Sequence, residues 1–516
     1  MPAVLLVAGL GLFTAYLRQA QTLPVESDGA SMALQAWDML HGNPLLRGWL
    51  LTDVSFYTTE LPQYMLVELL HGLNSDTVYI SAAMTYTFVV LLAALLAKGT
   101  ATGREGASRA LMAAGIMLAP SLGLATYALI ANPDHTGTQV PLLLVWLVLD
   151  RARPGWRPAV AVAVLLAWAQ VADPLVLYEG ALPLAVVCVM RMYRRHGPVR
   201  GHWYELSLIA AAAAAAGVAT LALKLILAVG GFSVGSPGGT FAYVDTLSSN
   251  VWVTAESVLQ LYGADFSGHV IDMGAVIPLV HLVGVILAAW AWAHAIRHFF
   301  ASELLVQVLA VAAAVLLIAY MLRGSPILTG SPHEIAGVLP IGAVLAGRLL
   351  PARLSSAGLV PTLALVLACY AGFLGYNAAQ PAAHSNRAQL TSWLAANHLI
   401  HGLSDYWTAN SVTLYSGNRV QVRPPDRRGS DSSWYDPAVH DARFYLIPTA
   451  CPSLPAAARD AWRHTVEAAY GKPAATYSAA GYLVMVWHEN LLADQLPPIP
   501  PPTNNCAEGS TTYLNP

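Results

Sequence analysis

The sequence has 516 residues, of which 56% are hydrophobic and only 11% are charged. Soluble globular chains carry about a quarter charged residues, so this composition excludes a soluble multidomain enzyme and is typical of a polytopic membrane protein. The 26 Lys and Arg residues against 29 Asp and Glu residues give a net charge of −3. Without a basic excess to neutralise phosphates, the chain is not expected to bind nucleic acid.

A helix needs about 20 predominantly apolar residues to cross the hydrocarbon core of a bilayer. Eleven apolar runs reach or approach this length. They cover residues 3–20, 77–97, 108–128, 138–150, 157–172, 174–190, 205–229, 273–296, 302–322, 335–350 and 357–377. The sequence therefore predicts an α-helical polytopic membrane protein with about 11 transmembrane helices.

Basic residues mark every second loop between these runs, and basic residues near span ends stay on the cytoplasmic side. The basic loops contain Lys98, Arg104, Arg109, Arg151, Arg153, Arg157, Arg191, Arg194, Arg195, Arg200, Arg297, Arg348 and Arg353. The alternate loops up to the last span contain Arg18, Arg47 and Arg323. This pattern predicts a cytoplasmic N-terminus. It places the long loops 21–76 and 230–272, and everything after residue 377, outside.

The chain becomes more polar after the last predicted span, which closes a transmembrane domain at 1–377. Short β-like runs alternate there with helical stretches, which is typical of a small α/β domain. The β-like runs are 411–415, 419–422, 443–447 and 482–487, and the helical stretches are 387–400 and 456–470. We expect an extracytoplasmic α/β domain at 378–496. The tail at 497–516 begins with PPIPPP and is expected to be disordered.

Two of the four cysteines, Cys451 and Cys506, lie in this outward part, where thiols can oxidise. We expect a disulfide between them. Cys188 and Cys369 fall inside predicted spans.

Asp28 follows the first span closely, and the next residues place apolar side chains at helical spacing over 29–40. This stretch is expected to be an amphipathic helix on the membrane surface, with Ser27 or Asp28 at its N-cap. Asp28 is either a simple cap or a base held at the bilayer surface beside a lipid-phosphate substrate. Position alone favours neither.

A second apolar and aromatic stretch covers 53–73. We expect a surface helix that turns Glu60 and Glu68 to water and buries its apolar face in the interface, with Tyr64, Val67, Leu70 and Leu73. Two surface helices directly after the first span would form a roof over a lateral cavity that lipids can enter.

Asp134 and His135 lie at the outward end of the third predicted span, in the turn ANPDHTGTQVP. An Asp-His pair beside the membrane can coordinate a divalent cation or orient a diphosphate. The alternative is that Asp134 caps the next span.

Arg323, His333 and Glu334 lie outside the ninth predicted span and open the tenth. Arg323 opposes the charge pattern that sets the topology, which favours a functional reason for its position. An Arg and a His beside a helix N-terminus favour binding of an anionic headgroup. This segment is therefore a candidate phosphate site.

The order of these elements resembles the GT-C superfamily of membrane glycosyltransferases, in particular the bacterial branch of protein mannosyltransferases and aminoarabinose transferases. SDGASMALQAWDMLHGNP is similar to the Asp-containing motif of the first loop. FYTTELPQYMLVELL, PDHTGT and SPHEIAGVLPIGAVLAG are similar to the next three motifs, and YWTANSVTLYSGNRVQVRP resembles the outward domain. The resemblance covers nearly the whole chain in order.

The resemblance implies an inverting glycosyltransferase in a bacterial cytoplasmic membrane, with its active site outside. Asp28 would be the general base on the acceptor hydroxyl, and Asp134 the second acidic residue. The donor would be a polyprenyl-phosphate sugar whose phosphate lies near Arg323 and His333, with Glu334 beside them. The acceptor would be a lipid, a polysaccharide or a protein.

The sequence departs from the family's pattern in two places. Gly29 follows Asp28, where many members have a second acid. Thr58, Thr59 and Glu60 precede the Pro of the second motif, where a basic residue is often found. Glu60 and His135 are candidate ligands of a divalent cation, Mg²⁺ or Mn²⁺.

Two other functions fit a lateral cavity. A transporter or flippase of lipid-linked precursors is expected to show internal repeats or broken, charged helices at mid-membrane depth, and the sequence has neither. Gly29 leaves a further alternative open, a GT-C-like scaffold that lacks catalysis and binds a partner through its tail.

Overall fold

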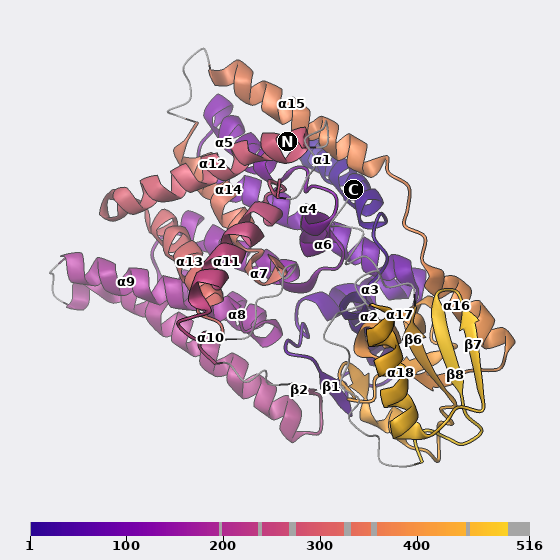
Figure 1. Ribbon diagram of the computed structural model, residues 1–516. Helices are drawn as coiled ribbons and strands as arrows, with labels where there is room; N and C mark the ends of the chain where they lie inside the picture. The colour runs from indigo at the N-terminus through magenta and orange to yellow at the C-terminus, as the bar shows by residue number, and fades with distance from the viewer. Residues whose placement is uncertain are drawn as a thin grey trace.

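The computed structural model describes residues 2–195, 199–235, 240–267, 275–324, 332–351, 359–449 and 455–493. Helices make up the first three-quarters of the chain, and a C-terminal domain with a five-stranded sheet packs at one end of them (Figure 1). We call this end the domain end. The opposite end, which carries Arg104, Arg109, Arg151 and Arg348, is called the arginine-rich end.

A helix lies at each of the eleven predicted spans. These helices are α1 (Pro2–Ala20), α4 (Ser75–Lys98), α5 (Gly103–Met117), α6 (Leu124–Ile130), α7 (Asp134–Arg151), α8 (Trp156–Ala172), η1 (Leu177–Ala181), α9 (Leu182–Arg195), α10 (Trp203–Ala228), α12 (Val276–Arg297), α13 (Leu304–Met321), α14 (Val338–Leu349) and α15 (Leu359–Ala378). Within the described ranges, five helices are long and apolar enough to cross a membrane: α4, α10, α12, α13 and residues 361–378 of α15. The model thus describes a helical membrane protein, and the count of eleven spans stays a prediction.

The run 108–128 was predicted as one span, but it forms two helices. Pro120 has no N–H to continue the ladder, so α5 ends at Met117 and α6 begins at Leu124. The carbonyl groups that the break exposes accept side-chain donors. Tyr16 Oη donates to Leu118 O at 2.9 Å, and Gln19 Nε2 and Asn377 Nδ2 donate to Pro120 O at 2.7 and 2.9 Å. A broken helix at this depth is tolerated because its carbonyl groups are bonded within the protein.

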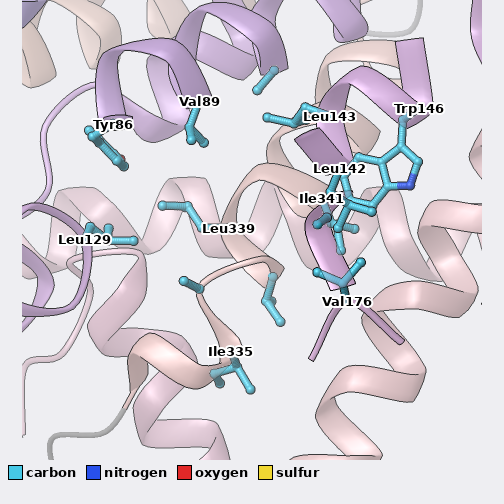
Figure 2. Close-up of a cluster of buried hydrophobic side chains, with 14 of the residues drawn as sticks. Tyr86, Val89, Leu129, Leu142, Leu143, Trp146, Val176, Ile335, Leu339 and Ile341 are labelled. Atoms are coloured by element: carbon cyan, nitrogen blue, oxygen red, sulfur yellow. The ribbon is translucent and has the colours of Figure 1, made fainter. Parts of the chain in front are cut away.

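The core of the helical part is a continuous cluster of buried apolar side chains (Figure 2). Figure 2 labels Tyr86 and Val89 of α4, Leu129 of α6, Leu142, Leu143 and Trp146 of α7, Val176, Ile335, and Leu339 and Ile341 of α14. In its most apolar window, α4 is 61% buried, whereas α10 and α12 are 28% buried. Thus α4 is a central helix, and α10 and α12 leave most of their surface for lipid.

Arg348 closes the core at the arginine-rich end. This buried side chain of α14 donates from Nε and Nη2 to Leu96 O at 3.1 and 2.8 Å. It forms an ion pair with Asp150 and contacts Glu303 at 3.1 Å. Every guanidinium nitrogen therefore has a partner, and one side chain joins α14 to α4, α7 and the start of α13.

The C-terminal domain has a five-stranded sheet in the order β4-β3-β6-β8-β7. The strands are β3 (His401–Leu403), β4 (Gln421–Arg423), β6 (Phe444–Pro448), β7 (Ala475–Ala479) and β8 (Tyr482–Val486). Strands β4, β3 and β6 are parallel, and β8 pairs antiparallel with β6 and β7. One apolar cluster joins the sheet to α16 (Asn386–Ala396) and α17 (Tyr406–Tyr415), and another joins it to α18 (Ala456–Tyr470).

The predicted helix at 456–470 and strands at 443–447 and 482–487 agree with α18, β6 and β8. The predicted strand at 411–415 is wrong, because these residues lie in α17. Asp405 starts that helix early by accepting a hydrogen bond from Trp407 N at 2.9 Å. Cys451, Cys506 and the tail from 497 lie outside the described residues.

A second, three-stranded sheet ties the C-terminal domain to the helical part. It has the order β2-β1-β5, with β1 (Trp49–Leu51) between β2 (Ser233–Val234) and β5 (Ser430–Asp431). The first long loop, the loop after α10 and the C-terminal domain are thus hydrogen-bonded to one another. The domain is fixed over the residues that follow α1.

Candidate active site

Three carboxylates meet at the domain end. Glu26, Asp28 and Asp134 each offer an oxygen, and these oxygens lie within 4.8 Å of one another. Glu26 and Asp28 flank the start of α2 (Ser27–Leu40), and Asp134 starts α7. We call these three residues the carboxylate triangle. It brings together Asp28 and Asp134, the two acids that the sequence singled out, and adds Glu26.

The start of α2 differs from the prediction. The helix begins at Ser27, so its N-cap is Glu26, whose side chain makes no capping hydrogen bond. Neither Ser27 nor Asp28 is the N-cap. The helix packs between α3 (Glu60–His71) and α17 (Figure 1) and buries residues 29–36, so its apolar side chains contact protein. A role as a cap therefore does not explain Asp28.

The C-terminal domain supplies the hydrogen-bond partner of Asp28. Tyr406 Oη donates to Asp28 Oδ1 at 2.5 Å, and Ser27 Oγ donates to the carbonyl oxygen of Tyr406. The guanidinium carbon of Arg428 lies 5.7 Å from the centre of the Tyr406 ring. Burial raises the pKa of Asp28 to about 6, although the hydrogen bond from Tyr406 lowers it. Near neutral pH this carboxylate can therefore accept a proton.

Glu26 is a member of the site that the sequence did not reveal. It accepts a hydrogen bond from Tyr127 Oη at 2.5 Å and one from Asn132 Nδ2. Burial and the charge of Asp28 raise the pKa of Glu26 well above its usual range. The two neighbouring acids therefore favour sharing a proton over both being ionised.

The structure gives a reason for Gly29. A Cβ at this position would lie 2.8 Å from Val78 Cγ1 and 3.1 Å from Asn132 Cβ, so a side chain has no room. A second acid is nevertheless present in space beside Asp28, because Glu26, two residues before it in the sequence, has a carboxylate oxygen within 4.8 Å of it.

Asp134 has a backbone φ of 29°, in the left-handed region that side chains other than glycine seldom adopt. It is the first residue of α7, and the N-cap is Pro133. Strained residues of this kind persist where the surrounding structure holds them, and they are frequent at functional sites. The unusual backbone turns Asp134 toward the triangle while α7 continues into the core.

Helix α3 departs from the prediction in its acids, because Glu60 and Glu68, expected to face water, are buried. Glu60, Tyr64 and Glu68 are buried against the protein, whereas Leu69 and Leu70 are 69% and 77% exposed. The apolar face therefore meets lipid, and the acids face inward. Burial raises the pKa of Glu60 well above its usual range and that of Glu68 to about 9. Within the described part of the chain, Glu60 Oε1 and both carboxylate oxygens of Glu68 have no hydrogen-bond partner.

His135 is adjacent to the triangle and is held by Asp173. Its Nδ1 lies 2.7 Å from Asp173 Oδ2, which also accepts from Thr138 Oγ1 at 3.3 Å. The other carboxylate oxygen of Asp173, Oδ1, accepts a hydrogen bond from Leu175 N at 2.8 Å. The ring of His135 lies parallel to that of His333, with centres 5.6 Å apart. Asp173 thus orients a pair of imidazole rings.

Arg323, His333 and Glu334 come together beside His135. Arg323 forms an ion pair with Glu334, and its side chain is 37% exposed. Burial and the positive charges of His135 and Arg323 lower the pKa of His333 to about 3. His333 is therefore a neutral imidazole that can donate a hydrogen bond but supplies no charge. The positive charge available to an anion on this side comes from His135 and Arg323.

The carboxylate triangle fits a divalent cation, since its three carboxylates are the hard oxygen ligands that Mg²⁺ and Mn²⁺ prefer. Asn132 donates to Glu26, but its own Oδ1 is buried without a hydrogen-bond partner in the described ranges. His135 and Glu60, the ligands expected from the sequence, are not part of this group of close ligand atoms. A cation role for those two residues stays a prediction.

The helical part together with the covering α/β domain has a fold that is shared with solved structures. The chain is similar to ArnT from Cupriavidus metallidurans bound to undecaprenyl phosphate, with a TM-score of 0.56 and 12% identity, over 96% of this chain and 99% of that one. It is similar to the apo state of the same protein with a TM-score of 0.53 and 10% identity, over 94% and 97%. At these identities the likeness shows the fold.

No protein-family model matches the sequence, and no curated protein matches it.

Several site residues carry no sequence signal that stands out. Glu26 is one acid among many in the first loop, and Tyr406 is separated from Asp28 by 378 positions. Asp53 is exposed, and its charge raises the pKa of Asp28, so it lies at the mouth of the site. The signal that could have found Glu26 is its place directly before the start of α2.

Proposed function

We propose that the protein is a glycosyltransferase that moves a sugar from a polyprenyl-phosphate donor to an acceptor hydroxyl, with inversion at the sugar carbon. The observation that carries this proposal is the carboxylate triangle beside an arginine and a neutral histidine. One side of the site can accept a proton, and the other can receive a phosphate. The fold shared with a protein that was solved with undecaprenyl phosphate supports a lipid-linked donor.

Asp28 acts as the general base in this proposal. Its carboxylate takes the proton of the acceptor hydroxyl while the oxygen attacks the sugar carbon. Tyr406 holds one carboxylate oxygen, Oδ1, which leaves Oδ2 to receive the proton. Glu26 and Asp134 lie beside Asp28 and raise its proton affinity through their charge, and a proton taken from the acceptor can be shared among the three carboxylates.

Arg323 and His333 act on the leaving group. The phosphate gains negative charge as the bond to the sugar carbon breaks, and the guanidinium group stabilises it. His333 donates a hydrogen bond from its neutral ring. Glu334 holds Arg323 in place until the phosphate competes for it.

A divalent cation is the alternative occupant of the carboxylate triangle: held by Glu26, Asp28 and Asp134, it would supply positive charge to the donor, and Asp28 would then be a ligand instead of the base. The positive-inside pattern supports an orientation with the arginine-rich end in the cytoplasm and the site outside. The acceptor is a lipid, a polysaccharide or a protein on that outer face.

The test is a transfer assay with purified protein, a radiolabelled polyprenyl-phosphate hexose or pentose, and membrane extract as the source of acceptors. Wild type is compared with Asp28→Asn and with Asp38→Asn, a second acid of α2 that lies outside the triangle and binds Trp49 Nε1. We expect Asp28→Asn to lower the transfer rate by about 10²–10⁴-fold and Asp38→Asn to retain activity. Equal turnover in Asp28→Asn would contradict its role as the base. No transfer from any donor by wild type would favour the inactive scaffold.

A further inference from the structure

A groove separate from the candidate active site lies between α5, α12 and α15, which Figure 1 draws together on the side away from the C-terminal sheet. Its volume is about 550 Å³, within the range of sites that hold small molecules. None of the candidate active-site residues lines it. The groove therefore needs its own explanation.

The lining combines one cation with a long apolar wall. Arg104 lies in the first turn of α5, with Ser108 one turn further along the same helix. Beyond them the wall is apolar, with Leu111 and Leu367 among the lining residues, and it ends at Tyr370. Tyr370 uses its hydroxyl to donate to Val280 O at 3.2 Å. The deep part of the groove thus offers carbon contacts, and charge is confined to the mouth.

Arg104 is available to an anion. The nearby Arg109 is occupied by Glu105 at 2.6 Å. Over the residues that the structure describes, Arg104 has no carboxylate within ion-pair distance, and its side chain is exposed at the end of α5. The hydroxyl of Ser108 already donates to the carbonyl oxygen of Arg104 at 2.9 Å. The guanidinium donors of Arg104 therefore match a phosphate group.

The length of the groove matches one leaflet of a bilayer. Arg104 and Ile116 line its two ends along α5, and at 1.5 Å per residue they are about 18 Å apart. Half of the roughly 30 Å hydrocarbon core is about 15 Å. A lipid whose phosphate contacts Arg104 therefore reaches the end of the groove with one acyl chain.

We propose that this groove binds one phospholipid from the leaflet at the arginine-rich end. Its phosphate contacts the guanidinium group of Arg104, and one acyl chain lies along α5, α12 and α15 as far as Tyr370. The site is independent of the proposed glycosyl transfer, because its ligand enters at the other end of the helical part. Its occupancy would fill the space between α15 and the rest of the bundle.

The test is photolabelling of the purified full chain in detergent with a phosphatidylglycerol that carries a diazirine at the end of one acyl chain. The matching diacylglycerol, which lacks the phosphate, is the probe control. Mass spectrometry of the peptides gives the labelled positions and the amount of label. We expect one label per chain, in the peptides that contain Gly284 and Tyr370, and little label from the diacylglycerol.

Four variants separate this site from general contact with lipid. Arg104→Gln should lower the labelling by about tenfold through the lost charge-assisted contact, and Arg104→Lys should restore most of it. Ala364→Phe, which fills the groove, should abolish the label. Leu365→Phe on the neighbouring, 65% exposed position is its control and should change nothing.

The proposal is overturned if Arg104→Gln and wild type label equally, or if the diacylglycerol labels as strongly as the phosphatidylglycerol. A label spread over the exposed surface of α10 would show general contact with the detergent-lipid layer and would also overturn it.

Discussion

Both ends of the helical part contain buried charged side chains, but the partners of these side chains differ. At the arginine-rich end, Arg348 has a partner for every guanidinium nitrogen. At the domain end, Glu26, Asp28 and Asp134 face one another, and the oxygens of Glu68 have no partner in the described residues. A paired buried charge holds helices together, whereas unpaired buried acids are unfavourable and call for a ligand or a proton. Functional chemistry is therefore expected at the domain end.

The largest expected effect on stability is at Arg348. Replacing it with Met leaves Asp150 without its cation in the interior, and breaking a buried ion pair in this way costs about 3–5 kcal/mol. Arg348→Met should lower the free energy of unfolding in detergent by that amount. The exposed Arg153, changed to Gln, is the control and should have no measurable effect. If the two variants are equally stable, Arg348 does not join the helices.

Gly29 tests the packing beside the triangle. A Cβ there collides with Val78 and Asn132, and overpacking of this kind costs about 1–3 kcal/mol. Gly29→Ala should lower the free energy of unfolding by that amount, as measured by denaturant unfolding. Gly11→Ala is the control, since its Cβ meets nothing within 4 Å. An unchanged stability in Gly29→Ala would remove the steric reason for glycine at this position.

Tyr406 tests how the C-terminal domain acts on Asp28. The hydrogen bond from Tyr406 stabilises the charged carboxylate, so Tyr406→Phe should raise the pKa of Asp28 above about 6. The base form is lost as pH falls, and the acid limb of the transfer rate should therefore move to higher pH. At pH values below the pKa of Asp28, the transfer rate of Tyr406→Phe should be about tenfold lower than that of wild type. This corresponds to about 1.4 kcal/mol in a charge-assisted hydrogen bond. Trp407→Phe, on the next residue, is the control.

An acid limb at the same pH in Tyr406→Phe and wild type would contradict this account of Tyr406. A uniform loss of rate at every pH would indicate a structural role instead.

Glu60 gives the smallest expected effect. Burial raises its pKa well above the usual range, so the folded protein holds a proton that the unfolded chain releases above about pH 4.5. The contribution of Glu60 to stability therefore falls as pH rises. Glu60→Gln carries no such proton and should be more stable than wild type at pH 8 by about 1 kcal/mol, and closer to it at pH 5. Unfolding at both pH values measures this, and a difference independent of pH would contradict it.

The positions of the helices were predicted from the sequence more accurately than the contacts that the helices make. Length and hydropathy located each helix, because apolar runs in a membrane protein have few alternatives to helical structure. The break at Pro120 was missed because the side chains that satisfy it, Tyr16 and Gln19, come from another helix. The acids of helix α3 were wrongly expected to face water, since periodicity gives the two faces of a helix but not which of them meets lipid and which meets protein.

The same physical limit explains why the candidate site was predicted only in part. Asp28 and Asp134 stand beside recognisable helix starts, so local pattern identified them. Glu26 and Tyr406 join the site through the packing of α2 against α17, which depends on contacts between distant segments. No local pattern encodes such contacts.

The central claim is that the unpaired charges at the domain end perform the chemistry and the paired charges at the other end hold the fold. Measuring both the transfer rate and the unfolding midpoint for Asp28→Asn and Arg348→Met tests it most directly. We predict that Asp28→Asn loses about 10²–10⁴-fold in rate with an unchanged midpoint, and that Arg348→Met unfolds earlier while each folded molecule keeps its rate. The opposite pattern, or a loss of both properties in both variants, would contradict the account.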